Sequence, residues 1–409
     1  MNDLQARVVI VGAGHAGGSV AALLRQYGAQ GPITLIGDEP ILPYHRPPLS
    51  KAWLKGEANA ESLALKPASF YTQHHIEFRS STRVNRIARD ARKVILDGGA
   101  SLDYEHLILA TGARPITLQI EGATLEGILF LRTAADAGKL KTHIGPGKRL
   151  AVVGGGYIGL EVAASGRALG ASVVVLEREP RLLARVACKL LSDFFRTYHE
   201  RRGVAFELDA NAVSFVGQDG QVCGVKLADG RVIDCDVVVV GVGAQPNDEL
   251  AAQAGLETAR GVVVDRHART SDPYIFAIGD VSLRPMPLYN RMFRMESVPN
   301  ALEQAKQAAS AITGRAAPAD EVPWQWSDQY DIKLQIAGYA FDSDQIVLRG
   351  EPGSGKFAIF HLQGEQVQSV EAINAPREFM MGRQLIGSRK AIDKHKLADT
   401  GISMKEVAV

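Results

Sequence analysis

Two glycine-rich turns, far apart in the chain, constrain the fold most strongly. One spans Gly12–Gly17 and follows the apolar run Val8–Val11, and the other spans Gly154–Gly159 and follows Leu150–Val153. Each pattern predicts a buried strand, a tight turn and the start of a helix, whose backbone N–H groups and positive dipole end attract a pyrophosphate. Because an acidic residue follows each turn by about twenty positions, the sequence predicts two dinucleotide sites. Two dinucleotides in one chain suggest that electrons pass from one to the other.

Composition limits the classes of partner and the compartment. A chain of 409 residues exceeds one hydrophobic core and predicts two or three domains. Its 46 basic and 45 acidic residues nearly cancel, which gives no charge argument for a nucleic acid or an anionic membrane as partner. No apolar stretch reaches the ~20 residues of a membrane helix, and the N-terminus shows no signal-peptide pattern. We therefore expect a cytoplasmic protein.

The chain has three cysteines, at positions 188, 223 and 235, and none forms a CxxC or CxxxxC pair. Such a chain cannot supply four thiolates to an iron–sulfur cluster of its own. It also lacks the vicinal pair that flavin disulfide reductases use as an internal electron relay. The ten histidines show no HExxH or other metal-ligand spacing, so no metal site is expected.

The order of the patterns predicts an α/β fold with one domain inserted into another. Strands alternate with helical patterns from residue 7 to about residue 310, which favours parallel sheets. Turn-rich junctions at Ala110–Pro115 and Gly241–Asn247 bracket the second glycine turn. The predicted domains are a discontinuous domain with the first glycine turn (1–112 and 246–322), an inserted domain with the second (113–245) and a C-terminal domain (323–409).

The C-terminal region has a different pattern. The segments Gln345–Leu348, Lys356–Gln363 and Val367–Ile373 are predicted strands joined by glycine-containing turns. A helix is predicted over Pro376–Ile392, although two glycines interrupt it. This region is expected to be a small α+β domain with an antiparallel sheet.

Two acidic residues are candidates for binding ribose. Asp38 follows Gly17 by 21 residues, and Glu177 follows Gly159 by 18 residues at the end of a predicted strand. A carboxylate at this point accepts hydrogen bonds from the ribose hydroxyls, and it repels the 2′-phosphate of NADPH. Glu177 therefore favours NADH, although Arg178 beside it could weaken that preference. The alternative for both residues is an ordinary solvated carboxylate.

Several segments resemble a known family. The segment Ser271–Asp280, the first glycine turn and Leu109–Gly112 resemble the two-dinucleotide flavoprotein reductases with the glutathione-reductase-like fold. The motifs that narrow the match are similar to the NADH-dependent ferredoxin reductases of oxygenase systems; they are Tyr44–Lys51, Tyr157–Glu161, Glu296–Ala301 and Trp324–Tyr330. The resemblance covers nearly the whole chain. It implies two Rossmann-like domains, of which the discontinuous one binds FAD and the inserted one binds NAD, and a small C-terminal interface domain.

The resemblance also implies the residues of the site. The contacts expected with non-covalently bound FAD, including the ribityl contact of Asp280, are Gly12, Gly14, Ala16, Gly17, Asp38, Lys51, Val84, Arg132, Asp280 and Val298. The contacts expected with NADH are Gly154, Gly156, Tyr157, Ile158, Gly159, Glu161 and Glu177. Further cofactor contacts are expected at Arg46, Thr111, Gly112, Gly243 and Trp326.

Three of these residues carry catalytic roles under the resemblance. Lys51 is a cation that would stabilise the negative charge of reduced flavin, Glu161 would lie beside the nicotinamide amide, and Trp326 would lie against the flavin on the acceptor side. Each has a plainer alternative. Lys51 could be a solvated lysine, Glu161 a carboxylate favoured by the helix dipole, and Trp326 a packing residue.

The expected activity follows from these assignments. NADH gives a hydride to FAD, and because the chain has no redox disulfide, the electrons must leave it. The resemblance implies a [2Fe–2S] ferredoxin as acceptor, feeding a cytochrome P450 or a ring-hydroxylating dioxygenase. The basic residues expected to dock an acidic ferredoxin are Arg291, Arg294, Lys306 and Lys333.

Two alternatives to this activity stay open. One is a related NADH flavoprotein with another acceptor: rubredoxin, a nitrite reductase module or oxygen. The other is an NADH-sensing flavoprotein resembling apoptosis-inducing factor.

Overall fold

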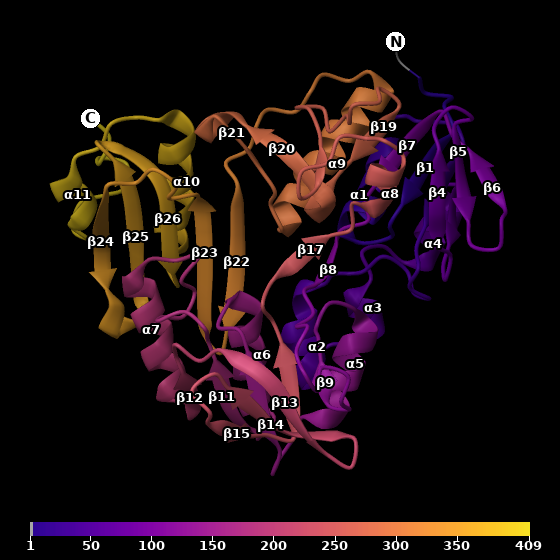
Figure 1. Ribbon diagram of the computed structural model, residues 1–409. Helices are drawn as coiled ribbons and strands as arrows, with labels where there is room; N and C mark the ends of the chain where they lie inside the picture. The colour runs from indigo at the N-terminus through magenta and orange to yellow at the C-terminus, as the bar shows by residue number, and fades with distance from the viewer. Residues whose placement is uncertain (1–2) are drawn as a thin grey trace. The chain divides into compact units, whose positions relative to one another are not determined.

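The computed structural model describes residues 3–409. The chain separates into two compact units, each built from three segments: unit 1 contains residues 1–45, 60–114 and 245–324, and unit 2 contains 46–59, 115–244 and 325–409. The units are described separately (Figure 1). The division predicted from the sequence differs in assigning residues 46–59 to the FAD-binding part and in separating the C-terminal sheet. That three-domain division stays a prediction.

Unit 1 is built on a five-stranded parallel sheet with the order β19-β7-β1-β2-β3. The strands of this sheet are β1 (Val8–Val11), β2 (Ile33–Ile36), β3 (Ile76–Arg79), β7 (His106–Leu109) and β19 (Ile275–Ala277). β1 is flanked by two strands and its four residues are all buried, which explains its uninterrupted run of β-branched residues.

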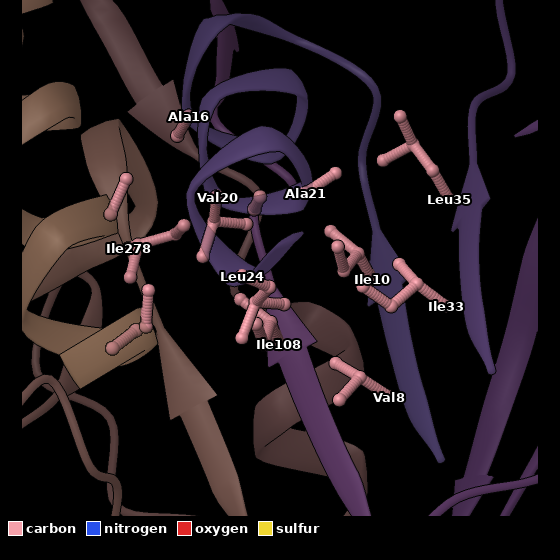
Figure 2. Packing of buried hydrophobic residues seen from close by; sticks show 14 of the residues in the cluster. Val8, Ile10, Ala16, Val20, Ala21, Leu24, Ile33, Leu35, Ile108 and Ile278 are labelled. Carbon is pink, nitrogen blue, oxygen red and sulfur yellow. The ribbon is translucent and has the colours of Figure 1, made fainter. Parts of the chain in front are cut away.

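One core cluster of unit 1 lies between this sheet and two helices, α1 (His15–Gln26) and α9 (Val298–Thr313), and a second cluster contains the alternate strand residues, such as Val9 and Leu107. Figure 2 shows Val20 and Leu24 of α1 close to Ile108 and Ile278. Small residues on both helices, such as Ala21 and Ala305, are fully buried and let the helices approach.

Smaller elements complete unit 1. They are α3 (Ala60–Leu63), α4 (Ala68–Gln73), β4 (Val84–Ala88), β5 (Lys93–Leu96), β6 (Ser101–Asp103), α8 (Glu249–Gln253), β18 (Val262–Val263), η2 (Gly279–Val281), β20 (Ser282–Met286), η3 (Pro287–Tyr289) and β21 (Arg291–Phe293). β4, β5 and β6 form one three-stranded sheet, and β18, β20 and β21 form another. The chain passes from one unit to the other five times: after residues 45 and 59, within β8 (Ala113–Pro115), within β17 (Ala244–Pro246) and at the start of β22 (Trp324–Gln329).

Unit 2 repeats the same parallel design. Its sheet has the order β12-β11-β10-β16-β9, with strands β9 (Ile128–Leu129), β10 (Arg149–Val153), β11 (Ser172–Leu176), β12 (Val204–Glu207) and β16 (Val237–Val240). The other elements of this part are η1 (Pro47–Ser50), α2 (Ala52–Lys55), α5 (Ala134–His143), α6 (Tyr157–Ala168), α7 (Lys189–Glu200), β13 (Ala212–Gln218), β14 (Gln221–Leu227) and β15 (Val232–Asp234). Two dinucleotide folds in one chain confirm the predicted internal repeat and fold class.

The C-terminal part of unit 2 is a five-stranded sheet with the order β22-β23-β26-β25-β24. β26 pairs antiparallel with both β23 and β25, and β25 pairs antiparallel with β24. Its further elements are β23 (Ile332–Gly338), β24 (Gln345–Glu351), η4 (Pro352–Ser354), β25 (Lys356–Gln363), β26 (Gln366–Ile373), α10 (Pro376–Ser388) and α11 (Lys394–Ala398). The sequence predicted the last three strands, with β24 ending three residues too early, but not β22 and β23.

The predicted helix over Pro376–Ile392 is shorter in the structure. α10 ends at Ser388 because Arg389 adopts φ of 52°, a left-handed conformation that stops a helix. Gly382 inside α10 has a packing reason, since a Cβ there would lie 2.7 Å from a methyl carbon of Val370. The glycine thus lets the helix lie close to β26.

Candidate functional site

The first glycine turn lies in unit 1, between β1 and α1. Gly12 has φ of 109°, and a Cβ on it would overlap the carbonyl oxygen of Ala110. A Cβ on Gly17 would overlap the carbonyl oxygen of Gly12. The N-cap of α1 is Gly14; no side chain caps this end, and its first turn contains no acidic residue. The turn therefore fits a pyrophosphate, which binds to helix N-terminal N–H groups that no carboxylate occupies.

The Gly-Asp turn of η2 adjoins this first turn. A Cβ on Gly279, which has φ of 75°, would lie 3.0 Å from the Cβ of Ala16. The guanidinium of Arg294 donates to the carbonyl oxygen of Asp280 at 3.1 Å, which fixes the backbone of the predicted ribityl contact. The structure thus brings together two motifs, at Ala16 and Asp280, that are far apart in the sequence.

The other predicted flavin residues of unit 1 lie at the ends of elements. Thr111 and Asn247 exchange hydrogen bonds, with Thr111 Oγ1 donating to the carbonyl of Asn247 at 2.7 Å and Asn247 Nδ2 donating to the carbonyl of Thr111 at 2.8 Å. The carboxylate of Asp38 is 66% exposed and lies 3.8 Å from Arg83. The remaining positions are Gly112 (φ 66°), the buried Val84 at the start of β4, and Val298 at the start of α9.

The second glycine turn repeats the geometry in unit 2. Gly154 has φ of 111°, and a Cβ on it would lie 2.5 Å from the carbonyl oxygen of Gly241. A Cβ on Gly159 would overlap the carbonyl oxygen of Gly154. Gly156, the N-cap of α6, has open space where a Cβ would stand, and no side chain caps the helix. This turn therefore fits a second dinucleotide.

Glu177 is anchored to this second turn. Its carboxylate accepts the N–H of Gly155 at 2.6 Å and the N–H of Glu179 at 2.9 Å. Two backbone donors hold the side chain at the end of β11, next to the glycines that would bind the pyrophosphate. That position suits a carboxylate that accepts from a ribose. Arg178 pairs with Glu179 at 3.1 Å rather than with Glu177.

We expect Glu177 to set coenzyme preference. Changing it to Gln, which keeps an acceptor oxygen but removes the charge, should raise efficiency with NADPH relative to NADH by roughly tenfold to a hundredfold, or about 1–3 kcal/mol. The measurement is kcat/KM with each coenzyme, and Glu179→Gln at the neighbouring carboxylate is the matched control. An unchanged ratio in Glu177→Gln would show that the carboxylate is not at the ribose.

Two predicted catalytic residues form an ion pair in unit 2. The Nζ of Lys51 lies 2.6 Å from Oε2 of Glu161, and the two side chains are 18% and 6% exposed. Ser50 donates to the same carboxylate oxygen at 2.5 Å, and Ser327 donates to Oε1 at 2.6 Å. Glu161 is thus a fixed, buried carboxylate, and its pairing with Lys51 excludes the interpretation of Lys51 as a solvated lysine. The first turn of α6 contains no acidic residue, so Glu161 lies beyond the part of the helix where the dipole favours a carboxylate.

A network of polar side chains extends from Glu161, and it was not predicted from the sequence. Gln329 donates through Nε2 to Ser327 Oγ at 3.1 Å, and its Oε1 lies 2.8 Å from Nε2 of His199. Burial lowers the pKa of His199 to about 4, so the imidazole is neutral at physiological pH. Spacing along the sequence could not predict this network, because its members come from α6, α7 and β22.

The remaining predicted residues of unit 2 are placed as follows. Arg46 donates to the carbonyl oxygen of Arg132 at 2.6 Å, which brings two predicted flavin contacts together. Trp326 is partly exposed and alternates along β22 with the buried Ser327, so the two side chains point to opposite faces. Gly243 has φ of 123°, and Ile158 is half exposed on α6.

The predicted docking residues differ in their exposure, and two of them form ion pairs with nearby carboxylates. The ammonium of Lys306 lies 2.9 Å from Glu321, and Arg294 lies 2.6 Å from Glu296. These carboxylates offset much of the positive charge. Arg291 and Lys333 are exposed.

No pair of cysteines forms a disulfide within residues 3–409: Cys188, Cys223 and Cys235 are all free. Burial raises the pKa of Cys235 to about 12, so this thiol is inert. In the same part of the chain, every helix is too short or too polar to cross a lipid bilayer.

Comparison with known proteins agrees with this geometry. Residues 6–305 match the family model of pyridine nucleotide-disulphide oxidoreductases, and residues 324–408 match that of the reductase C-terminal domain. A probable ferredoxin reductase of Castellaniella defragrans is 50% identical over 404 residues, covering 98% of this chain and 99% of the relative. A rubredoxin-NAD(+) reductase of Pseudomonas putida is 40% identical, covering 90% and 96%.

A solved structure is similar over nearly the whole chain. In the covalent putidaredoxin reductase–putidaredoxin complex, the matching chain is 40% identical, with a TM-score of 0.96 and coverage of 98% of this chain and 97% of that one. The chain belongs to the pyridine nucleotide-disulphide oxidoreductase family, among its ferredoxin reductases.

Proposed function

We propose that this protein is an FAD-containing reductase that takes a hydride from NADH and passes single electrons to a [2Fe–2S] ferredoxin. The ferredoxin would serve a cytochrome P450 or a ring-hydroxylating dioxygenase. The observation that carries the proposal is the pair of glycine turns at Gly12–Gly17 and Gly154–Gly159, each of which leads into a helix whose N-terminus no side chain caps. The described cysteines form no redox pair. The family match and the named ferredoxin reductases among its relatives support it.

The side chains around the turns divide the work. The turn after β1 would hold the FAD pyrophosphate, with Asp38 at the ribose and Asp280 at the ribityl chain, while the turn after β10 and Glu177 would hold NADH. FAD, when bound, accepts two electrons together and releases them singly. Glu161 holds Lys51 in place, so that a fixed positive charge can offset the negative charge of the reduced cofactor.

The identity of the electron acceptor has one specific alternative. One relative is named a rubredoxin reductase, so family membership alone leaves the iron carrier open. The match of residues 324–408 to the reductase C-terminal model and the likeness to a reductase–putidaredoxin complex favour a ferredoxin. A cytoplasmic location, where NADH is supplied, is part of the same proposal.

We expect the purified protein to contain about one non-covalent FAD per chain. Acid precipitation should release all the yellow colour, because no attachment pattern for a covalent flavin occurs in the sequence. Anaerobic addition of one equivalent of NADH should bleach the flavin absorption. Colour that stays in the pellet would contradict the non-covalent assignment, and an oxidised spectrum after NADH addition would contradict the reductase assignment.

Docking of an acidic ferredoxin should depend on charge at Arg291. Arg291→Glu should raise the apparent KM for ferredoxin by about tenfold at low salt and leave the reduction of FAD by NADH unchanged, since a charge at the rim acts mainly on association. Lys226→Glu, which changes an exposed lysine on β14, is the matched control. If neither Arg291→Glu nor added salt changes the KM for ferredoxin, docking rests on an apolar contact around Trp326 instead.

A further inference from the structure

Three side chains with metal-ligand chemistry meet in unit 2, outside the site described above. Cys188 is the N-cap of α7, His361 lies on β25 and Glu371 lies on β26 (Figure 1). The Sγ of Cys188 lies 3.1 Å from Oε2 of Glu371, and Nε2 of His361 lies 3.3 Å from the same oxygen. All three ligand atoms lie within 4.8 Å of one another.

The strand register explains why the two sheet residues face the same way. Glu371 pairs with Ile359 across the β25–β26 ladder, and His361 is two positions further along β25. Residues two apart on a strand point to the same face, so His361 is the diagonal neighbour of Glu371. The N-terminus of α7 supplies the third group.

In the described part of the chain, no lysine or arginine pairs with the carboxylate of Glu371. Its side chain is 3% exposed, and among the described residues its contacts are the N–H of Cys188 at 3.3 Å, the thiol of Cys188 and the ring of His361. The Nε2 atom of His361 is buried and makes no hydrogen bond, because its approach to Glu371 lacks hydrogen-bond geometry. A buried carboxylate beside an unsatisfied ring nitrogen is costly unless a positive charge lies between them.

The distances of the sulfur and the ring nitrogen from the carboxylate oxygen suit a tetrahedral cation. Zinc bonds of about 2.0–2.3 Å to sulfur, nitrogen and oxygen place neighbouring ligand atoms roughly 3.3–3.6 Å apart. The separations of 3.1 and 3.3 Å at Glu371 are close to this range. We propose that Cys188, His361 and Glu371 bind one thiophilic divalent cation with the chemistry of Zn²⁺, with solvent at the fourth position.

Binding would change the state of the thiol. Without a cation, the thiol of Cys188 keeps its proton and donates it to Oε2 of Glu371 at 3.1 Å. The cation would displace this proton to solvent and bond to the thiolate. Cys188 is only partly buried, which leaves a path for an ion to enter.

The first test is titration of the EDTA-treated holoprotein with Co²⁺, which reports coordination by its spectrum. We expect one Co²⁺ per chain, with a thiolate-to-cobalt charge-transfer band and d–d bands at wavelengths beyond the flavin absorption. Cys188→Ser should abolish the charge-transfer band, and His361→Gln should weaken binding at least tenfold. Cys223→Ser, which removes the other partly exposed thiol, is the matched control and should leave the spectrum unchanged.

The second test needs no variant and so does not depend on mutant folding. Cd²⁺ added to the wild-type protein should protect Cys188, but not Cys223, from alkylation, as mapped by mass spectrometry. Absence of a charge-transfer band in the wild type, persistence of the band in Cys188→Ser, or alkylation of Cys188 at the same rate with and without Cd²⁺ would each overturn the site. The three residues would then be a metal-free thiol–carboxylate–imidazole cluster.

Discussion

Lys51→Met should lower the midpoint potential of the bound flavin by about 30–60 mV, which corresponds to about 1.4–2.8 kcal/mol for a two-electron couple. The reason is the loss of a fixed positive charge: the ammonium is 18% exposed and is held 2.6 Å from Glu161, in surroundings where a charge is less screened than in water. The rate of flavin reduction by NADH should fall roughly tenfold to a hundredfold, as seen when one electrostatic group is removed from a site. Spectroelectrochemistry and stopped-flow absorbance measure the two effects.

Two variants test whether charge is the cause. Lys51→Arg keeps the charge and should retain most of the wild-type potential, whereas Lys55→Met removes a lysine whose partner, Glu57, is exposed, and should change nothing. The fold should tolerate Lys51→Met because Ser50 and Ser327 still donate to Glu161. A wild-type potential in Lys51→Met would show that Lys51 serves only to neutralise Glu161.

Gly12→Ala should yield protein with little or no bound FAD. The substitution places a Cβ against the carbonyl oxygen of Ala110 and at φ of 109°, where neither the backbone overlap nor the torsion can relax easily. We expect a loss of more than about 3 kcal/mol in the free energy of unfolding. Flavin content per chain and thermal unfolding followed by circular dichroism measure the two effects.

The control for Gly12→Ala is Gly98→Ala, in the same unit. Gly98 also has a positive φ, 84°, but nothing lies within 4 Å of its would-be Cβ. The Gly98→Ala variant should therefore lose only about 1 kcal/mol in the free energy of unfolding and keep its FAD. Full flavin content and wild-type stability in Gly12→Ala would contradict the turn geometry.

The α/β core could be predicted from the sequence because its strands are buried on both faces. Val8–Val11 and Val237–Val240 are uninterrupted apolar runs, Ile33–Ile36 is interrupted only by Thr34, and the structure has strands with the same bounds. β22 was missed because it mixes buried and partly exposed polar residues, as in Trp324–Gln329, and so lacks an apolar run. β23 has apolar residues at alternate positions, Ile332, Leu334 and Ile336, a strand pattern that was present in the sequence but was not used. The end of α10 at Arg389 depends on one left-handed residue, which a hydrophobic pattern does not show.

The candidate site, like the fold, has parts that local sequence predicts and parts that it does not. The glycine turns and Glu177 have fixed spacing along the chain, so local pattern was enough to find them. The pairing of Lys51 with Glu161 and the donation from Ser327 join residues up to 166 positions apart, and they depend on tertiary packing. The cluster at Cys188 and Glu371, 183 positions apart, was invisible for the same reason. All the cofactor contacts expected from the sequence stay predictions, those of the glycine turns, Glu177 and Lys51 included.

The central claim is that electrons from NADH leave the chain one at a time to a [2Fe–2S] ferredoxin. The most direct measurement is the NADH-dependent reduction of cytochrome c with catalytic amounts of this protein, with and without an added [2Fe–2S] ferredoxin, and with rubredoxin in place of ferredoxin. We predict rapid reduction only when ferredoxin is present, with two cytochromes reduced for each NADH oxidised. Equal rates with and without ferredoxin, or reduction through rubredoxin alone, would contradict it.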